Sequence, residues 1–72
     1  MIEYRQDRMI GTLYRRVAGT PEEYDGRTKE WKLTGQALAA YGPSSDTRRI
    51  SEEDAMKEIA RLAEFYGNKE WG

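Results

Sequence analysis

The side chains best suited to chemistry in this sequence are aromatic and basic residues that stand next to one another. They occur together at Tyr4-Arg5, Tyr14-Arg15-Arg16, Trp31-Lys32 and Arg48-Arg49. Eight of the twelve basic residues are arginine, which binds phosphate or carboxylate through a planar fork and stacks on rings. This pattern is typical of surfaces that stack nucleic-acid bases and contact phosphates. The competing interpretation, which we favour, is that the rings form a sheet core and the arginines pair with carboxylates.

Catalysis finds little support among the residue types. The chain has no histidine and no cysteine, so the usual bases, nucleophiles and zinc ligands are missing. The acidic clusters Glu22-Glu23-Asp25 and Glu52-Glu53-Asp54 follow a Thr and a Ser in capping register. In that register the carboxylates lie where they interact favourably with the dipole at the N-terminus of a helix, and we favour this role over a magnesium site. We therefore expect a protein that is not an enzyme and uses no cofactor or metal.

Length and charge favour a small module that binds another protein. The chain has 72 residues and a net charge of −1, whereas a dedicated nucleic-acid binder has a clearly basic domain. A chain this short buries only about 60% of its unfolded surface, which suits an accessory subunit or an inhibitor of another protein. Mobile elements and phages often carry chains of this kind. The residues that we expect to contact the partner are Tyr14, Arg16, Arg48, Arg49 and Trp71.

Two alternatives remain for the partner. A small nucleic-acid-binding module would use tyrosine and arginine residues of the sheet, and a homodimer would form through an edge strand. A membrane is not expected, because no apolar run approaches the length of a spanning helix and MIEYRQDR at the N-terminus lacks the apolar part of a signal peptide. We expect a cytoplasmic protein.

The clearest predicted element is an amphipathic helix over residues 52–66. Ser51 begins it with a pattern similar to a capping box, and three acidic residues follow where the helix dipole favours them. Apolar residues then recur at helical spacing and form one face, at Ala55, Met56, Ile59, Leu62, Ala63 and Tyr66. Gly67-Asn68 supplies a stop signal. Such an apolar face must pack against another part of the fold or against a partner.

The middle of the chain is less clear. The pattern Thr20-Pro21-Glu22-Glu23 predicts a short helical turn that Asp25-Gly26 ends. Residues 30–34 alternate like a strand. Residues 35–41 either extend that strand or form a short alanine-rich helix capped by Thr34. Residues 47–50 lead into the cap of the C-terminal helix.

The opening segment decides how the arginines can act. Residues 4–18 fit either a helix or a strand, and we favour a strand over 10–17 because Gly11 weakens a helix by about 1 kcal/mol. On a strand, the neighbours Arg15 and Arg16 must point to opposite faces. A surface that relies on both of them is then excluded.

These elements predict one α+β domain over residues 1–72. Its sheet has about three antiparallel strands, with the C-terminal helix packed on one face. The layout is similar to small DNA-binding modules of three strands and a helix, none of whose motif residues the chain matches.

Overall fold

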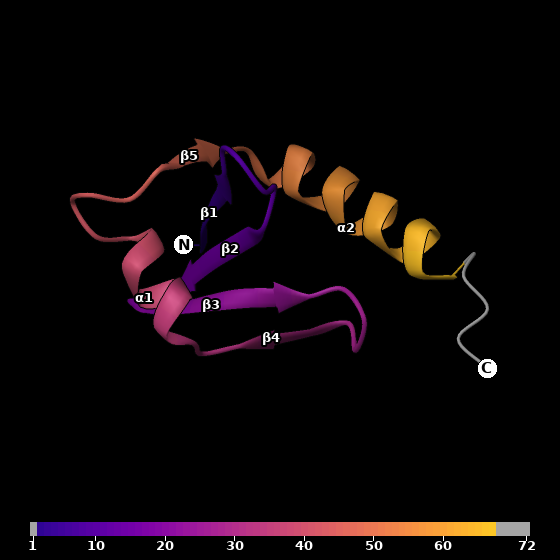
Figure 1. Cartoon of the computed structure of the whole chain (residues 1–72), viewed down its shortest axis with the longest axis horizontal. Coiled ribbons are helices and arrows are strands. Elements are labelled where there is room, and N and C mark those ends of the chain that lie inside the picture. Colours follow the sequence, from indigo (N-terminus) through magenta and orange to yellow (C-terminus); the bar gives the residue numbers. More distant parts are fainter. Residues whose placement is uncertain (1, 68–72) are drawn as a thin grey trace.

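A computed structural model of the protein describes residues 2–67 (Figure 1). Within this range the elements follow the order β1 (Ile2–Asp7), β2 (Leu13–Val17), β3 (Thr20–Asp25), β4 (Glu30–Lys32), α1 (Gly35–Ala40), β5 (Thr47–Ile50) and α2 (Glu52–Gly67). The strands form one antiparallel sheet with the order β4-β3-β2-β1-β5. The α+β class and the C-terminal helix are confirmed. The sheet has five strands in this part of the chain rather than about three.

Two kinds of tight turn join the first four strands. Ala18 and Gly19 both have positive φ, 50° and 84°, and connect Val17 to its partner Thr20. This is the backbone of a two-residue type I′ hairpin, whose twist matches that of the flanking strands. After β1, the Asp7 carboxylate accepts hydrogen bonds from the backbone N–H groups of Met9 and Ile10, both at 2.8 Å. The meander is therefore encoded by local turn chemistry.

Helix α2 covers part of one face of the sheet. It begins as expected, with the Ser51 hydroxyl accepting from the Asp54 N–H at 3.0 Å. Its residues Ala55, Ile59 and Leu62 join a core with four buried residues from β1, β2, β3 and β5, which are Tyr4, Leu13, Tyr24 and Ile50. Trp31 of β4 is partly buried against the same core. Met56, expected on the buried face, is 45% exposed. Only a narrow stripe of α2 side chains therefore contacts the sheet. Figure 1 shows the C-terminal turns of α2 leading away from β5.

Helix α1 covers part of the opposite face. Thr34 caps it, since its hydroxyl accepts from the Ala37 N–H at 3.0 Å. Ala37 and Ala40 are buried against Tyr14. The helical alternative for residues 35–41 is thus confirmed, and the strand extension is wrong. Neither helix among residues 2–67 is long and apolar enough to cross a membrane.

One local prediction is wrong and another holds only in part. The helical turn predicted at Thr20 is strand β3, because pairing with β2 on one side and β4 on the other replaces the capping pattern. The strand predicted over 10–17 begins at Leu13, and a turn occupies the preceding residues. Residues 4–7, part of the segment for which helix and strand were both open, belong to β1, a central strand with partners on both sides.

Candidate functional site: an arginine surface on the sheet

Three arginines from adjacent strands meet on the sheet face that carries α1. Arg5 on β1 lies opposite Arg49 on β5, and Arg16 on β2 lies opposite Glu3 on β1. Residues that oppose one another across antiparallel strands share a face, and alternation along β1 places Glu3 and Arg5 on the same side. We call Arg5, Arg16 and Arg49, with Glu3 and Tyr41 between them, the arginine surface.

Tyr41, at the C-terminal cap of α1, fixes the centre of the arginine surface. Its hydroxyl donates to the backbone carbonyl of Glu3 at 2.7 Å, which ties the end of α1 to β1. The guanidinium carbons of Arg5 and Arg16 lie 5.3 and 5.1 Å from the centre of the ring, a distance at which cations are attracted to the ring face. Burial, helped by the Glu3 charge and opposed by the two arginines, raises the pKa of Tyr41 to about 12. The phenol therefore stays protonated and keeps this contact at neutral pH.

Glu3 is the carboxylate of the arginine surface. Its two oxygens accept from Arg5 Nε at 2.9 Å and from Arg16 at 2.7 Å, and its side chain is 18% exposed. Partial burial acts to raise the Glu3 pKa, but the Arg5 hydrogen bond and the charges of Arg16, Arg5 and Arg49 together lower it. One negative charge thus stands among three positive ones. Arg49 makes no hydrogen bond or ion pair within residues 2–67.

Arg15 lies on the other face, with α2. Its guanidinium carbon is 4.3 Å from the centre of the Trp31 ring, and its Nε donates to Glu22 at 2.7 Å. Trp31 in turn packs against Tyr24, with ring centres 4.9 Å apart. The rings that alternate with arginine in the sequence are therefore core residues: Tyr4 and Tyr14 are 6% and 4% exposed, and Trp31 is covered by Arg15.

The residues expected to contact a partner fall in different places. Arg16 and Arg49 join the arginine surface. Tyr14 is buried beneath α1 and does not reach it. Arg48 is exposed on the opposite face, opposite Gln6 on β1. Trp71 lies outside the described residues.

The residues that the sequence led us to expect at a partner contact do not include Glu3, Arg5 or Tyr41. For the first two, a signal was present: IEYRQD alternates with period two, which places Glu3 and Arg5 on one face of any strand. For Tyr41 no local signal exists. Its place beneath two guanidinium groups follows from the packing of α1 on the sheet.

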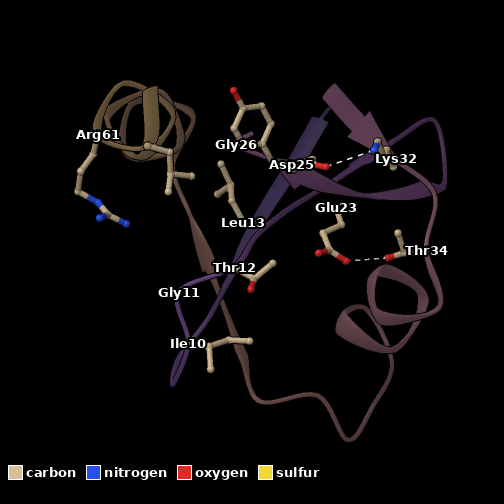
Figure 2. A pocket seen from close by; sticks show the side chains of 12 residues that line it. Ile10, Gly11, Thr12, Leu13, Glu23, Asp25, Gly26, Lys32, Thr34 and Arg61 are labelled. Atoms are coloured by element: carbon tan, nitrogen blue, oxygen red, sulfur yellow. Dashed lines mark hydrogen bonds and ion pairs between the residues drawn. The ribbon is translucent and has the colours of Figure 1, made fainter. Parts of the chain in front are cut away.

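A cleft lies at the end of the sheet, away from the arginine surface (Figure 2). It has a volume of about 450 Å³ and is bounded by the β1–β2 loop, β3, β4 and α2. Its charged side chains already have partners: Glu23 accepts from the Thr34 hydroxyl at 2.9 Å, and Asp25 pairs with Lys32 at 3.2 Å. Arg61, on the α2 side of the cleft, pairs with Glu58. The charged side chains that line this cleft among the described residues are therefore already engaged in hydrogen bonds or ion pairs.

Comparison with known proteins gives no family for the chain. No family model matches it, and no curated protein or solved structure matches it. Function must be inferred from the surfaces of the molecule itself.

Proposed function

We propose that the protein is a non-catalytic interaction module, an accessory subunit or inhibitor, that binds an acidic segment of a partner protein on the arginine surface. The observation that supports this most directly is the convergence of Arg5, Arg16 and Arg49 from three adjacent strands. Arginine binds carboxylates in a geometrically defined way. Arginine and tyrosine are also enriched among the residues that dominate binding at interfaces.

The arginine surface is ordered before any partner arrives. Glu3 and Tyr41 hold the guanidinium groups of Arg5 and Arg16 in place. Ordering a long side chain on binding costs free energy, so prior ordering favours affinity. Among residues 2–67 the Arg49 guanidinium has no such partner, and it is the group most available to a carboxylate of the bound protein.

Several observations favour a protein over a nucleic acid. The rings of Tyr4 and Tyr14 are buried and cannot stack on bases. The ring of Trp31 is covered by Arg15. The net charge of −1 gives no general attraction for a polyanion. A nucleic acid is therefore an outcome for the experiment to detect rather than the partner that we propose.

Fluorescence anisotropy at low salt tests the proposal. The probes are a short glutamate-rich peptide, its glutamine counterpart, and single- and double-stranded oligonucleotides. We expect the glutamate peptide alone to bind, and Arg16→Gln and Arg49→Gln to weaken binding by about three- to tenfold each. Arg15→Gln is the matched control, because Arg15 faces the other side of the sheet. Failure of the glutamate peptide to bind, or tighter binding of an oligonucleotide, would overturn the proposal.

A further inference from the structure

Strand β5 ends the sheet, and its outer edge has no neighbouring strand among residues 2–67. The Arg8 N–H donates to the Asp46 carbonyl at 3.1 Å, just beyond the β1–β5 pairs. Bonded and non-bonded pairs alternate along an antiparallel ladder. Arg48 and Ile50 therefore direct their backbone groups toward β1, whereas Thr47 and Arg49 direct theirs outward. The outer edge offers two N–H and two C=O groups in strand geometry.

The side chains on both sides of this edge are positively charged. Arg49 projects onto the α1 face beside Arg5, and Arg48 projects onto the α2 face beside Gln6. Neither guanidinium group makes a direct hydrogen bond or ion pair within the described part of the chain. An edge with this charge selects a partner strand by complementarity rather than pairing with any exposed strand.

A second copy of the chain is a poor occupant. Two β5 strands placed side by side would bring four arginines together on a short stretch of edge. Like charges opposite one another destabilise strand pairing. The homodimer that the sequence left open is therefore disfavoured at β5, and a strand carrying acidic residues fits better.

We propose that an extended acidic segment of a partner protein adds to β5 as a further strand of the sheet. Its backbone would bond to the outward groups of Thr47 and Arg49, the mode known as strand addition. Successive residues of a strand face opposite sides, so two adjacent acidic residues reach Arg49 on one face and Arg48 on the other. This inference rests on the proposed function and specifies how the acidic segment is held.

The experiment uses the full chain and a pair of synthetic peptides. One is a short threonine- and valine-rich peptide with two adjacent glutamates, and the other has the same sequence with alternate backbone amides N-methylated. N-methylation removes backbone donors and keeps the charge. We expect saturating peptide to slow the amide hydrogen exchange of Thr47 and Arg49 by about tenfold or more, as protection by new hydrogen bonds requires. The exchange of Arg48 and Ile50, already bonded to β1, should not change.

Affinity supplies the second readout. The N-methylated peptide should bind about tenfold more weakly than the unmodified one, and Arg48→Gln should weaken binding of the unmodified peptide several-fold, unlike the control Arg15→Gln. Strand addition is overturned if both peptides bind with equal affinity and the exchange at Thr47 and Arg49 does not change. In that case, the proposed function still stands if binding depends on Arg16 and Arg49. If neither of these peptides binds but the glutamate-rich peptide does, strand addition fails and the proposed function stands. If the glutamate-rich peptide does not bind either, both proposals fail.

Discussion

Arg15 and Arg16 are neighbours in the sequence and lie on opposite faces of the sheet. The guanidinium carbon of Arg15 is 4.3 Å from the centre of the Trp31 ring on the α2 face. That of Arg16 is 5.1 Å from the centre of the Tyr41 ring on the α1 face. This confirms the consequence expected for a strand. The two arginines that share the α1 face with Arg16 are Arg5 and Arg49, and they come from other strands.

The first prediction concerns the charge coupling of Arg16 to Glu3. The pKa of Glu3 is lowered by Arg5, Arg16 and Arg49 against the opposing effect of burial. Arg16→Gln should therefore raise the Glu3 pKa, as followed by NMR titration of the side-chain carboxyl carbon. Arg15→Gln should leave this pKa unchanged, because Arg15 pairs with Glu22 on the far face. An equal shift in both variants would contradict the arrangement of the two faces.

The second prediction concerns stability in acid. The Glu3 pKa is below its ordinary value of 4.5 in the folded protein, so the unfolded chain takes up the proton first as pH falls. The stability that Glu3 contributes is complete above about pH 4.5 and is lost as pH falls through the folded pKa. Glu3→Gln should lower the free energy of unfolding at neutral pH and have little effect at pH 2, as measured by urea denaturation.

The control for this variant is Glu64→Gln, which removes an exposed carboxylate of α2. It should change stability little at either pH. A Glu3→Gln effect that is the same at neutral pH and at pH 2 would show that the carboxylate charge is not the cause.

The third prediction concerns Tyr41 in alkali. Its pKa of about 12 lies above the ordinary value of 10.0, chiefly because the ring is buried. The contribution of a raised pKa is complete below the unfolded value and is lost as pH rises toward the folded one. Stability should thus fall between about pH 10 and 12, and Tyr41→Phe should flatten part of that fall. The Tyr14 pKa is also raised, by burial and then by Glu23 and Asp7, so Tyr14 should contribute to the same fall.

At neutral pH Tyr41→Phe removes the hydrogen bond to the Glu3 carbonyl. This should cost about 0.5–1.5 kcal/mol. No loss of stability at pH 7 would mean that the bond is replaced by water without cost.

The fourth prediction concerns the β2–β3 turn. Gly19 has φ of 84°, and a Cβ built there meets no atom within 4 Å. Gly19→Ala should therefore lower the free energy of unfolding by about 1–2 kcal/mol through backbone strain alone. Gly35 also has open space but no positive φ and opens α1. Gly35→Ala should therefore stabilise the folded protein by about 0.5–1 kcal/mol. Thermal denaturation of both variants tests this difference.

The fifth prediction concerns the cap of α1. The Thr34 hydroxyl accepts from Ala37 and donates to Glu23 Oε1 at 2.9 Å. Thr34→Ala should cost about 1 kcal/mol for the cap, with a further loss because Glu23 lies without its donor. Thr34→Ser keeps the hydroxyl and should restore most of the stability. Equal destabilisation by Ala and Ser would assign the effect to the Thr34 methyl group instead.

The sequence predicted best where local signals and tertiary contacts agree. The C-terminal helix has a Ser51 cap, acidic residues in its first turn and helical apolar spacing, and it forms as expected. The Thr34 cap identified α1 as one of two alternatives. Both signals act within one helical turn, so they do not depend on the rest of the fold.

Prediction failed where a local signal competes with strand pairing. Thr20-Pro21-Glu22-Glu23 has the spacing of a capping box, yet Thr20 pairs with Val17, and Glu22 meets Arg15 across the sheet. A cap contributes about 1 kcal/mol, and ladders on two sides outweigh it. Pro21 is tolerated because it precedes the β3–β4 ladder, which begins at Glu23.

The sequence alone determined the class of the fold and the C-terminal helix, because period-two alternation and helix caps act over a few residues. The separation of Arg15 from Arg16 followed from the strand that we favoured over the helical alternative. Tertiary structure decided which arginines meet. The strand order β5-β1-β2 brings Arg49, Arg5 and Arg16 together from distant positions in the chain. Packing of α1 then sets Tyr41 between two of them. Pairing between strands depends on long-range contacts that no local pattern encodes.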